Sequence, residues 1–206
     1  DNLETTVELR TLHLENANNK LKYMASHDPM TGLRNRLELE NDIEDAIEHN
    51  LQKGAPYAIL MFDIDWFKKV NDEYGHDVGD MVLMEVSAIL RDSIRGNDKA
   101  FRAGGEEFVL LLDRITYEDS LRLAQKIRKL IKSHVFKVGK EAFSKTISCG
   151  LYYSSLFEVR HVKEVLKLVD IALYESKENG RNRVTVVNKS MNLKIKQTVE
   201  SVQDSD

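Results

Sequence analysis

The sequence contains little cysteine and no histidine pattern that suits a metal. Cys149 is the only cysteine, which excludes a disulfide framework and argues against a zinc site. A chain with one thiol suits a reducing compartment, and we expect a cytoplasmic protein. The six histidines show no metal-ligand spacing; they are His13, His27, His49, His76, His134 and His161.

Long hydrophobic runs and an excess of positive charge are also missing. No apolar run approaches the roughly 20 residues of a membrane-spanning helix, and we expect no signal peptide in this sequence. The formal net charge of -4 argues against a nucleic-acid partner held by bulk positive charge. The phosphate-binding motif G-x-x-x-x-G-K-[ST] is absent, which excludes a P-loop enzyme. Any phosphate must therefore be held by a few local groups.

Length and hydrophobic content indicate one globular domain with appendages. The chain has 206 residues, and its 42% hydrophobic content is enough for a sizeable core. It begins at Asp1 without a methionine, so we expect a fragment whose sensor or membrane anchor lies upstream. The expected division is a signalling and dimerisation helix at 1–26, a globular domain at 27–188, and a frayed or loosely helical tail at 189–206.

The first 26 residues carry a narrow apolar stripe on alternating steps of four and three, which is the seam of a coiled coil. The stripe consists of Leu3, Val7, Leu14, Ala17, Leu21 and Met24. Arg10 occupies one slot of the seam and weakens it. Because most other positions are polar, we predict a helix that pairs with a second copy. The alternative is a helix packed on its own domain through Leu9 and Leu12.

The rest of the chain alternates between strand and helix patterns. Pro29 and Gly32 end the first helix, and a second helix runs to about Leu51. Residues 66–80 are interpreted as a loop before a helix over 81–94 and, later, helices over 117–134 and 161–180. Strands are predicted at 57–65, 99–103, 106–112, 144–154 and 183–187. The order β-α-β-β-α-β predicts an α+β fold, in which a palm-like antiparallel sheet of split βαβ type is flanked by helices.

Acidic residues occur at two points that this topology brings together. Asp63 and Asp65 end the first strand, and Glu106 and Glu107 follow the glycine pair 104–105. The first strand and the later hairpin should lie side by side, so these carboxylates converge and repel each other unless a cation neutralises them. Oxygen ligands left open to substrate phosphates favour Mg²⁺. An isolated pair of glutamates is more often a solvated surface feature.

Basic residues lie near the same point. Lys68 follows the first strand, and Lys177 and Arg181 lie at the end of the last long helix. A metal, a triphosphate and the absence of a P-loop indicate metal-assisted phosphoryl or nucleotidyl transfer. The alternative role for Lys177 and Arg181 is to complement the negative end of their helix.

Four segments occur in an order that resembles the GGDEF domain family, the diguanylate cyclases that make cyclic di-GMP from two GTP. They are DPMTGLRNR, FDIDWFKKVNDEYGHDVGD, RAGGEEF and DIALYESKENGRNR, and the resemblance covers about residues 26–187. It implies a palm-like fold related to the class III nucleotidyl cyclases, in agreement with the element order.

The resemblance implies a metal site and a reaction. Asp63, Glu106 and the Ile64 carbonyl would bind Mg²⁺, with Mn²⁺ as a substitute. Glu106 or Glu107 would help deprotonate the ribose 3′-hydroxyl that attacks an α-phosphate. Lys68 would offset charge in the transition state.

The resemblance also implies a guanine site. Asn71 and Asp80 would hydrogen-bond the guanine edge, with His76 and Phe67 among the substrate contacts. Asp80 can accept from the guanine ring N–H and amine, whereas adenine would present an acceptor there, so GTP should be preferred. The alternative for His76 is a structural role in its turn.

Phosphate and product sites complete the set that the resemblance implies. Lys68, Lys177 and Arg181 would hold the β- and γ-phosphates. Arg95 and Asp98, in the segment RGND, fall where the family has its product-binding inhibitory site. Such a pair is also common as an ion pair between residues three apart on a helix surface.

The symmetric product implies a homodimer in which each domain supplies half of a site, and the N-terminal helix would set whether the halves meet. The sequence therefore predicts a diguanylate cyclase with product inhibition. One alternative is a catalytically silent receptor for cyclic di-GMP or GTP. Another is a different purine cyclase or mixed dinucleotide synthase, which Asp80 disfavours.

Overall fold

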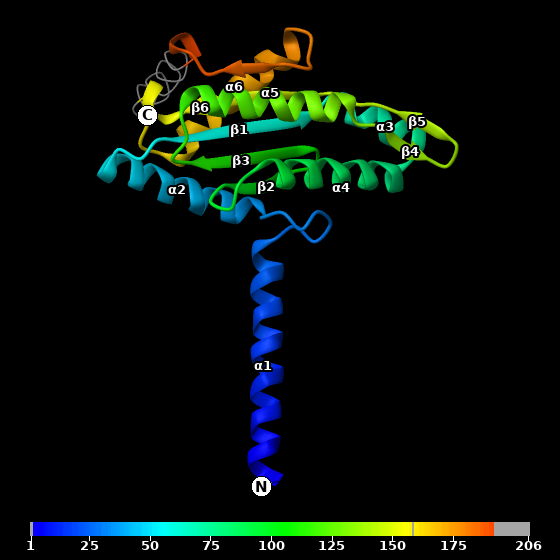
Figure 1. The fold of residues 1–206 in the computed structure, drawn as a ribbon, viewed down its shortest axis with the longest axis vertical. Helices are drawn as coiled ribbons and strands as arrows, with labels where there is room; N and C mark the ends of the chain where they lie inside the picture. The colour runs from blue at the N-terminus through cyan, green and yellow to red at the C-terminus, as the bar shows by residue number, and fades with distance from the viewer. Residues whose placement is uncertain (1, 158, 192–206) are drawn as a thin grey trace, which may run out of the picture.

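The structure, a computed structural model, describes residues 2–157 and 159–191, with side chains from residue 7 onward. Figure 1 shows the first helix as a straight stalk that projects from a globular domain. The helices are α1 (Asn2–Ser26), α2 (Arg36–Lys53), α3 (Phe67–Tyr74), α4 (His76–Ser93), α5 (Tyr117–Ser133) and α6 (Val162–Glu178), with a 3-10 turn, η1, at Ser154–Leu156. None of the helices in the described part is both long and apolar enough to span a bilayer.

A five-stranded sheet forms the centre of the domain, and its spatial order is β2-β3-β1-β6-β7. The strands are β1 (Tyr57–Ile64), β2 (Lys99–Gly104), β3 (Glu107–Asp113), β6 (Ile147–Tyr153) and β7 (Val184–Val186). The pairs β2/β3, β3/β1 and β1/β6 are antiparallel, and the edge pair β6/β7 is parallel. The predicted α+β fold is confirmed, and the hairpin lies beside the first strand.

Side-chain alternation along β1 divides the core into two layers. Ala58, Leu60 and Phe62 join a cluster that contains apolar residues of α3, α4 and α5. Ile59 and Met61 join a second cluster, which contains residues of α2 and α6. Because successive side chains of a strand point to opposite faces, the residue after Phe62 faces α2 and α6.

A close approach between β6 and α6 fixes the position of the last long helix. A Cβ atom at Gly150 of β6 would lie 2.2 Å from the Val169 carbonyl oxygen and 2.6 Å from the Leu173 nitrogen. Only glycine fits at this distance, so the two backbones meet directly. This contact brings the C-terminal end of α6 to the end of the sheet where β1 finishes.

Local signals account for several helix boundaries. The Asn35 side chain accepts a hydrogen bond from the Glu38 N–H and so caps α2. Thr116 caps α5 in the same way through the Asp119 N–H. The Asn35 amide also donates to the Ala25 carbonyl oxygen at 2.7 Å, which ties the end of α1 to the start of α2.

Two parts of the sequence-based prediction are wrong. Residues 66–80, predicted as a loop, form α3 and the start of α4. The helix α3 was missed because only Phe67 and Val70 face the core among polar neighbours. A small hairpin of β4 (Phe136–Val138) and β5 (Glu141–Phe143) was also not predicted, because strands of three residues carry little periodicity.

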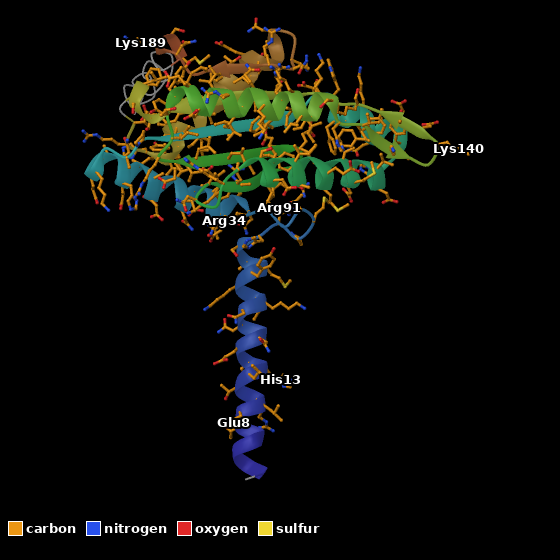
Figure 2. The ribbon with its side chains drawn as sticks, viewed as in Figure 1. Glu8, His13, Arg34, Arg91, Lys140 and Lys189 are labelled. Atoms are coloured by element: carbon orange, nitrogen blue, oxygen red, sulfur yellow. The ribbon has the colours of Figure 1, made fainter. Side chains whose placement is uncertain are left out.

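The stalk helix does not pack on its own domain. Leu14 and Leu21 of the predicted seam are 71% and 66% exposed, and Leu9 and Leu12 are 54% and 53% exposed. Figure 2 shows Glu8 and His13 far along the stalk. Packing through Leu9 and Leu12 is therefore not what the structure shows, and pairing with a second copy stays a prediction. The Leu3 side chain and residues 192–206 of the predicted tail lie outside the described residues.

Candidate active site at the end of β1

Carboxylates from β1 and the hairpin turn meet at one end of the sheet. Asp63 of β1 and Glu107 of β3 are direct partners in the antiparallel register, and both follow the alternation onto the α6 face. The Asp63 side chain is only 8% exposed, and Lys177 of α6 places its Nζ 2.7 Å from Asp63 Oδ2. The structure therefore brings Asp63, Glu107 and Lys177 together at this end of the sheet.

The electrostatics of this cluster favour an added cation. Burial raises the pKa of Asp63, and the charges of Glu107 and Asp65 raise it further, although Lys177 opposes them. Burial likewise raises the pKa of Glu106, with the charge of Asp63 adding to it and Lys177 opposing. One ammonium group does not balance these acids. Carboxylate oxygens are ligands that suit a hard divalent ion.

The predicted metal ligands fit such an ion as a set of two carboxylates and a backbone carbonyl. Within the described residues, no three acidic, imidazole or thiol side chains converge closely enough to hold a metal by themselves. The predicted set does not require three side chains, because its third predicted ligand is the backbone carbonyl oxygen of Ile64, which ends β1 directly after Asp63. Glu106 is half-buried in the turn beside the cluster.

Asp65, expected in the carboxylate cluster, has a structural role instead. Its side chain is 2% exposed and accepts hydrogen bonds from the hydroxyls of Thr146 and Ser148, both at 2.6 Å. It also accepts from the Asn182 backbone N–H at 3.0 Å. Asp65 adds negative charge to the site, but its oxygens are occupied in joining β1, β6 and the segment after α6.

A contact that the sequence analysis missed fixes the hairpin turn. Arg102 donates to the Gly105 carbonyl oxygen through Nε at 3.1 Å and through the terminal nitrogen Nη2 at 2.8 Å. It also donates to both carboxylate oxygens of Asp28 at 3.2 Å. Burial disfavours the charge of Asp28, but hydrogen bonds from Thr31 and Arg102 outweigh burial and lower its pKa. The sequence offered one signal for this contact, because the motif DPMTGLRNR begins with Asp28 and the motif RAGGEEF begins with Arg102.

The helices α3 and α4 build a separate part of the site. A Cβ atom at Gly79 would lie 1.9 Å from Asn71 Oδ1 and 3.3 Å from Phe67 Cζ. The Asn71 side chain therefore lies against Gly79, the residue that precedes Asp80 in the chain. Phe67 is only 6% exposed, so its ring supports this arrangement from the core. His76, the first residue of α4, is exposed.

The basic residues lie on two elements near the end of β1. Lys68 is exposed in the first turn of α3, where backbone N–H groups lack partners within the helix. Arg181 follows α6 with a φ of +61°, and its guanidinium carbon lies 3.9 Å from the centre of the Trp66 ring. Trp66 itself has a φ of +60° between β1 and α3. Left-handed backbone at a residue other than glycine costs about 1–2 kcal/mol, so surrounding contacts must hold it.

The predicted product-binding pair forms an internal ion pair in this structure. Asp98 is buried and accepts from the backbone N–H groups of Arg95 and Asp113 at 3.3 and 3.2 Å. The Arg95 Nε lies 3.3 Å from Asp98 Oδ2, and its guanidinium donates to the Asp113 carbonyl oxygen at 2.6 Å. The alternative interpretation expected an ion pair between these residues, but on a helix surface; the pair lies instead in the turn between α4 and β2. Arg95 remains exposed at the surface.

Comparison with known proteins gives consistent matches. The family model described as "Diguanylate cyclase, GGDEF domain" matches residues 25–183. Diguanylate cyclase A of Treponema denticola is 38% identical over 82% of this chain and 46% of its own length. Diguanylate cyclase DgcM of Escherichia coli is 41% identical over 80% of this chain and 39% of its own length. The chain thus spans less than half the length of these curated relatives.

Solved structures show the same fold. The coiled coil and GGDEF domain of DgcB from Caulobacter crescentus, in complex with c-di-GMP, matches with a TM-score of 0.81 and 26% identity. This match covers 90% of this chain and 100% of that one. The active GGEEF domain of a diguanylate cyclase from Vibrio cholerae matches with a TM-score of 0.70 and 30% identity, over 76% of this chain and 99% of that one.

Proposed function

Because the chain belongs to the GGDEF domain family of diguanylate cyclases, we propose that it condenses two GTP molecules into cyclic di-GMP and two pyrophosphates. In each half of the reaction, a ribose 3′-oxygen bonds to the α-phosphorus of the other nucleotide, and the bond to pyrophosphate breaks. The observation that carries this proposal is the cluster of Asp63, Glu106, Glu107 and Lys177 at the end of β1.

Asp63, Glu106 and the Ile64 carbonyl would hold a divalent ion, for which Mg²⁺ is the proposed identity. When bound, this ion would neutralise triphosphate charge and lower the pKa of the attacking hydroxyl. Glu106 accepts the hydroxyl proton in this proposal, with Glu107 in support.

Lys177, Arg181 and Lys68 hold the β- and γ-phosphates. Lys177 bonds to Asp63 in this structure, and a metal ion at Asp63 would release its ammonium group for phosphate. Arg181 can present parallel N–H donors to a phosphate, which suits bidentate binding. Lys68 adds charge beside the first-turn amides of α3.

Guanine specificity comes from the packing of α3 against α4. Asn71, held against Gly79, donates to the guanine acceptors, and Asp80 accepts from the guanine ring N–H and amine. Adenine would turn an acceptor toward Asp80 and leave that carboxylate unpaired. The site therefore selects GTP over ATP.

The product requires two domains that face each other about a two-fold axis. The exposed seam of α1 is the proposed pairing surface, and Arg95 with Asp98 is the proposed product-binding inhibitory site. Product binding there would need the Arg95 guanidinium to leave the Asp113 carbonyl oxygen.

Incubation of the protein with Mg²⁺ and GTP, ATP or both, followed by chromatographic separation of the nucleotides, tests the proposal. Cyclic di-GMP from GTP alone is the expected product. Glu106→Gln is the matched control, because it keeps the side-chain shape and should abolish product. A protein that binds GTP without forming a dinucleotide would be a silent receptor, and a mixed product with ATP would contradict the guanine site.

A further inference from the structure

An exposed tryptophan lies next to the candidate active site without belonging to the core. Trp66, the only tryptophan in the chain, is 53% exposed and directly follows Asp65. Two cationic side chains lie over its ring. The Arg181 guanidinium carbon is 3.9 Å from the ring centre, and Lys69 Nζ is 4.6 Å from it. The ring thus contacts one cation from α3 and one from the segment that follows α6.

The backbone around Arg181 is anchored independently of Trp66. The Arg181 N–H donates to the Ser176 carbonyl oxygen at 3.0 Å. The next residue, Asn182, donates its N–H to Asp65, and its side-chain oxygen accepts from Arg128 of α5 at 2.8 Å. These contacts hold two consecutive residues in the left-handed region, with φ of +61° and +48°. These contacts fix the position of the Arg181 backbone, but they do not fix the position of its guanidinium group.

The Trp66 ring fixes the position of the Arg181 guanidinium. The hydrogen bond from Arg181 to the Lys177 carbonyl oxygen is 3.3 Å long and therefore weak. Stacking on the ring covers one face of the planar guanidinium and leaves its N–H groups, which point outward in the plane, able to bind a phosphate. A long arginine side chain held in place before binding loses less conformational entropy when the ligand arrives.

We propose that the Trp66 ring is a positioning residue that holds the Arg181 guanidinium ready for the β- and γ-phosphates of the nucleotide. This inference rests on the proposed function, because it takes the triphosphate as the ligand of Arg181. It adds a side chain to which neither the sequence pattern nor the family resemblance gave a role in binding.

Equilibrium binding of two nucleotides to Trp66→Leu tests the proposal. The probes are a GTP analogue with a methylene bridge between the α- and β-phosphates, which blocks turnover, and GMP, which lacks the β- and γ-phosphates. Trp66→Leu should weaken binding of the GTP analogue about two- to fivefold, the effect of a cation–π contact at an exposed ring, and leave GMP binding unchanged. Trp66→Phe, which keeps an aromatic ring, should bind the analogue within about twofold of the original protein.

Lys69→Ala is the matched control, because it removes the other cation over the same ring. It should change the affinity for the GTP analogue by less than Trp66→Leu does. Equal losses for the analogue and GMP in Trp66→Leu would show that Trp66 supports the fold, and no loss for either would show that the ring is not needed. Either result overturns the inference.

Failure of the inference is distinguishable from failure of the proposed function. A protein that makes cyclic di-GMP but binds the analogue equally well with leucine at position 66 refutes only the role of Trp66. A protein that makes no cyclic di-GMP refutes the proposed reaction, and the binding comparison still decides the role of Trp66. Binding of neither nucleotide to the original protein would refute both.

Discussion

Replacing Gly79 by alanine should impair guanine binding while leaving the fold intact. The new Cβ atom would lie 1.9 Å from Asn71 Oδ1, a distance that no two such atoms maintain. The contact with Phe67 Cζ, at 3.3 Å, needs a shift of only a few tenths of an ångström. The Asn71 amide is the flexible partner, so it must swing away from its place against Gly79.

Two separate effects are expected, one on GTP affinity and one on the free energy of unfolding. Asn71 would lose its hydrogen bonds to guanine, and two bonds of about 0.5–1.5 kcal/mol each correspond to a loss of about five- to 150-fold in GTP affinity. Alanine in place of glycine inside a helix adds about 0.4–1 kcal/mol to the free energy of unfolding. We therefore expect a large binding defect with a change in stability of less than about 1 kcal/mol.

A double-mutant cycle with Asn71→Ala separates these terms. In the Asn71→Ala background the amide is gone, so Gly79→Ala should be neutral or stabilising and should not weaken GTP binding further. Affinity for the methylene-bridged GTP analogue and urea unfolding are the two measurements. If Gly79→Ala alone left affinity and GTP preference unchanged, the placement of Asn71 against Gly79 would not serve guanine binding.

Three further predictions concern other parts of the molecule. Glu106→Gln should lower turnover by a factor of about 10² to 10³ or more. The raised pKa of Glu106 means that its charge destabilises the metal-free fold, so Glu106→Gln should raise the free energy of unfolding at pH 7. This gain should disappear as the pH falls below the ordinary glutamate pKa of 4.5, because the carboxyl group is then neutral in both the folded and the unfolded protein. A gain that persists at such a pH would contradict the electrostatic cause. Arg95→Ala should keep turnover and relieve product inhibition, and an unchanged product-dose curve would exclude the inhibitory role. Leu14→Asp should make activity depend more steeply on protein concentration, and an unaltered dependence would argue against pairing through α1.

The sequence predicted those parts of the fold whose signal is long and regular. The apolar run that ends in Asp63 gave β1, and the glycine pair before Glu106 gave the hairpin, so the meeting of their acids followed from topology. The helix α3 was missed because eight residues with two inward side chains resemble a polar loop. The roles of individual residues came from the family resemblance, and they stay predictions where the structure shows only proximity.

The structural role of Asp65 could not be read from the sequence, because its partners are distant in the chain. Thr146 and Ser148 lie 81 and 83 residues away, and Asn182 lies 117 residues away. Two acids spaced by one residue on a strand should point the same way, as Asp63 and Asp65 do. What divides their roles is the set of donors that other elements supply, and such donors are known only once the strands are paired.

Three of the four non-glycine residues with left-handed backbone in the described part of the chain lie beside the end of β1. Trp66, Arg181 and Asn182 all have left-handed backbone, at about 1–2 kcal/mol for each residue other than glycine, with the cost smallest for asparagine. Asp65 bonds to the Asn182 N–H and directly precedes Trp66 in the chain, so it links both strained segments. A buried acid that accepts three hydrogen bonds can offset such strain, because charged acceptors form stronger bonds than neutral ones. Of the two acids at the end of β1, Asp65 therefore stabilises the local geometry, and Asp63 is left for the proposed metal site.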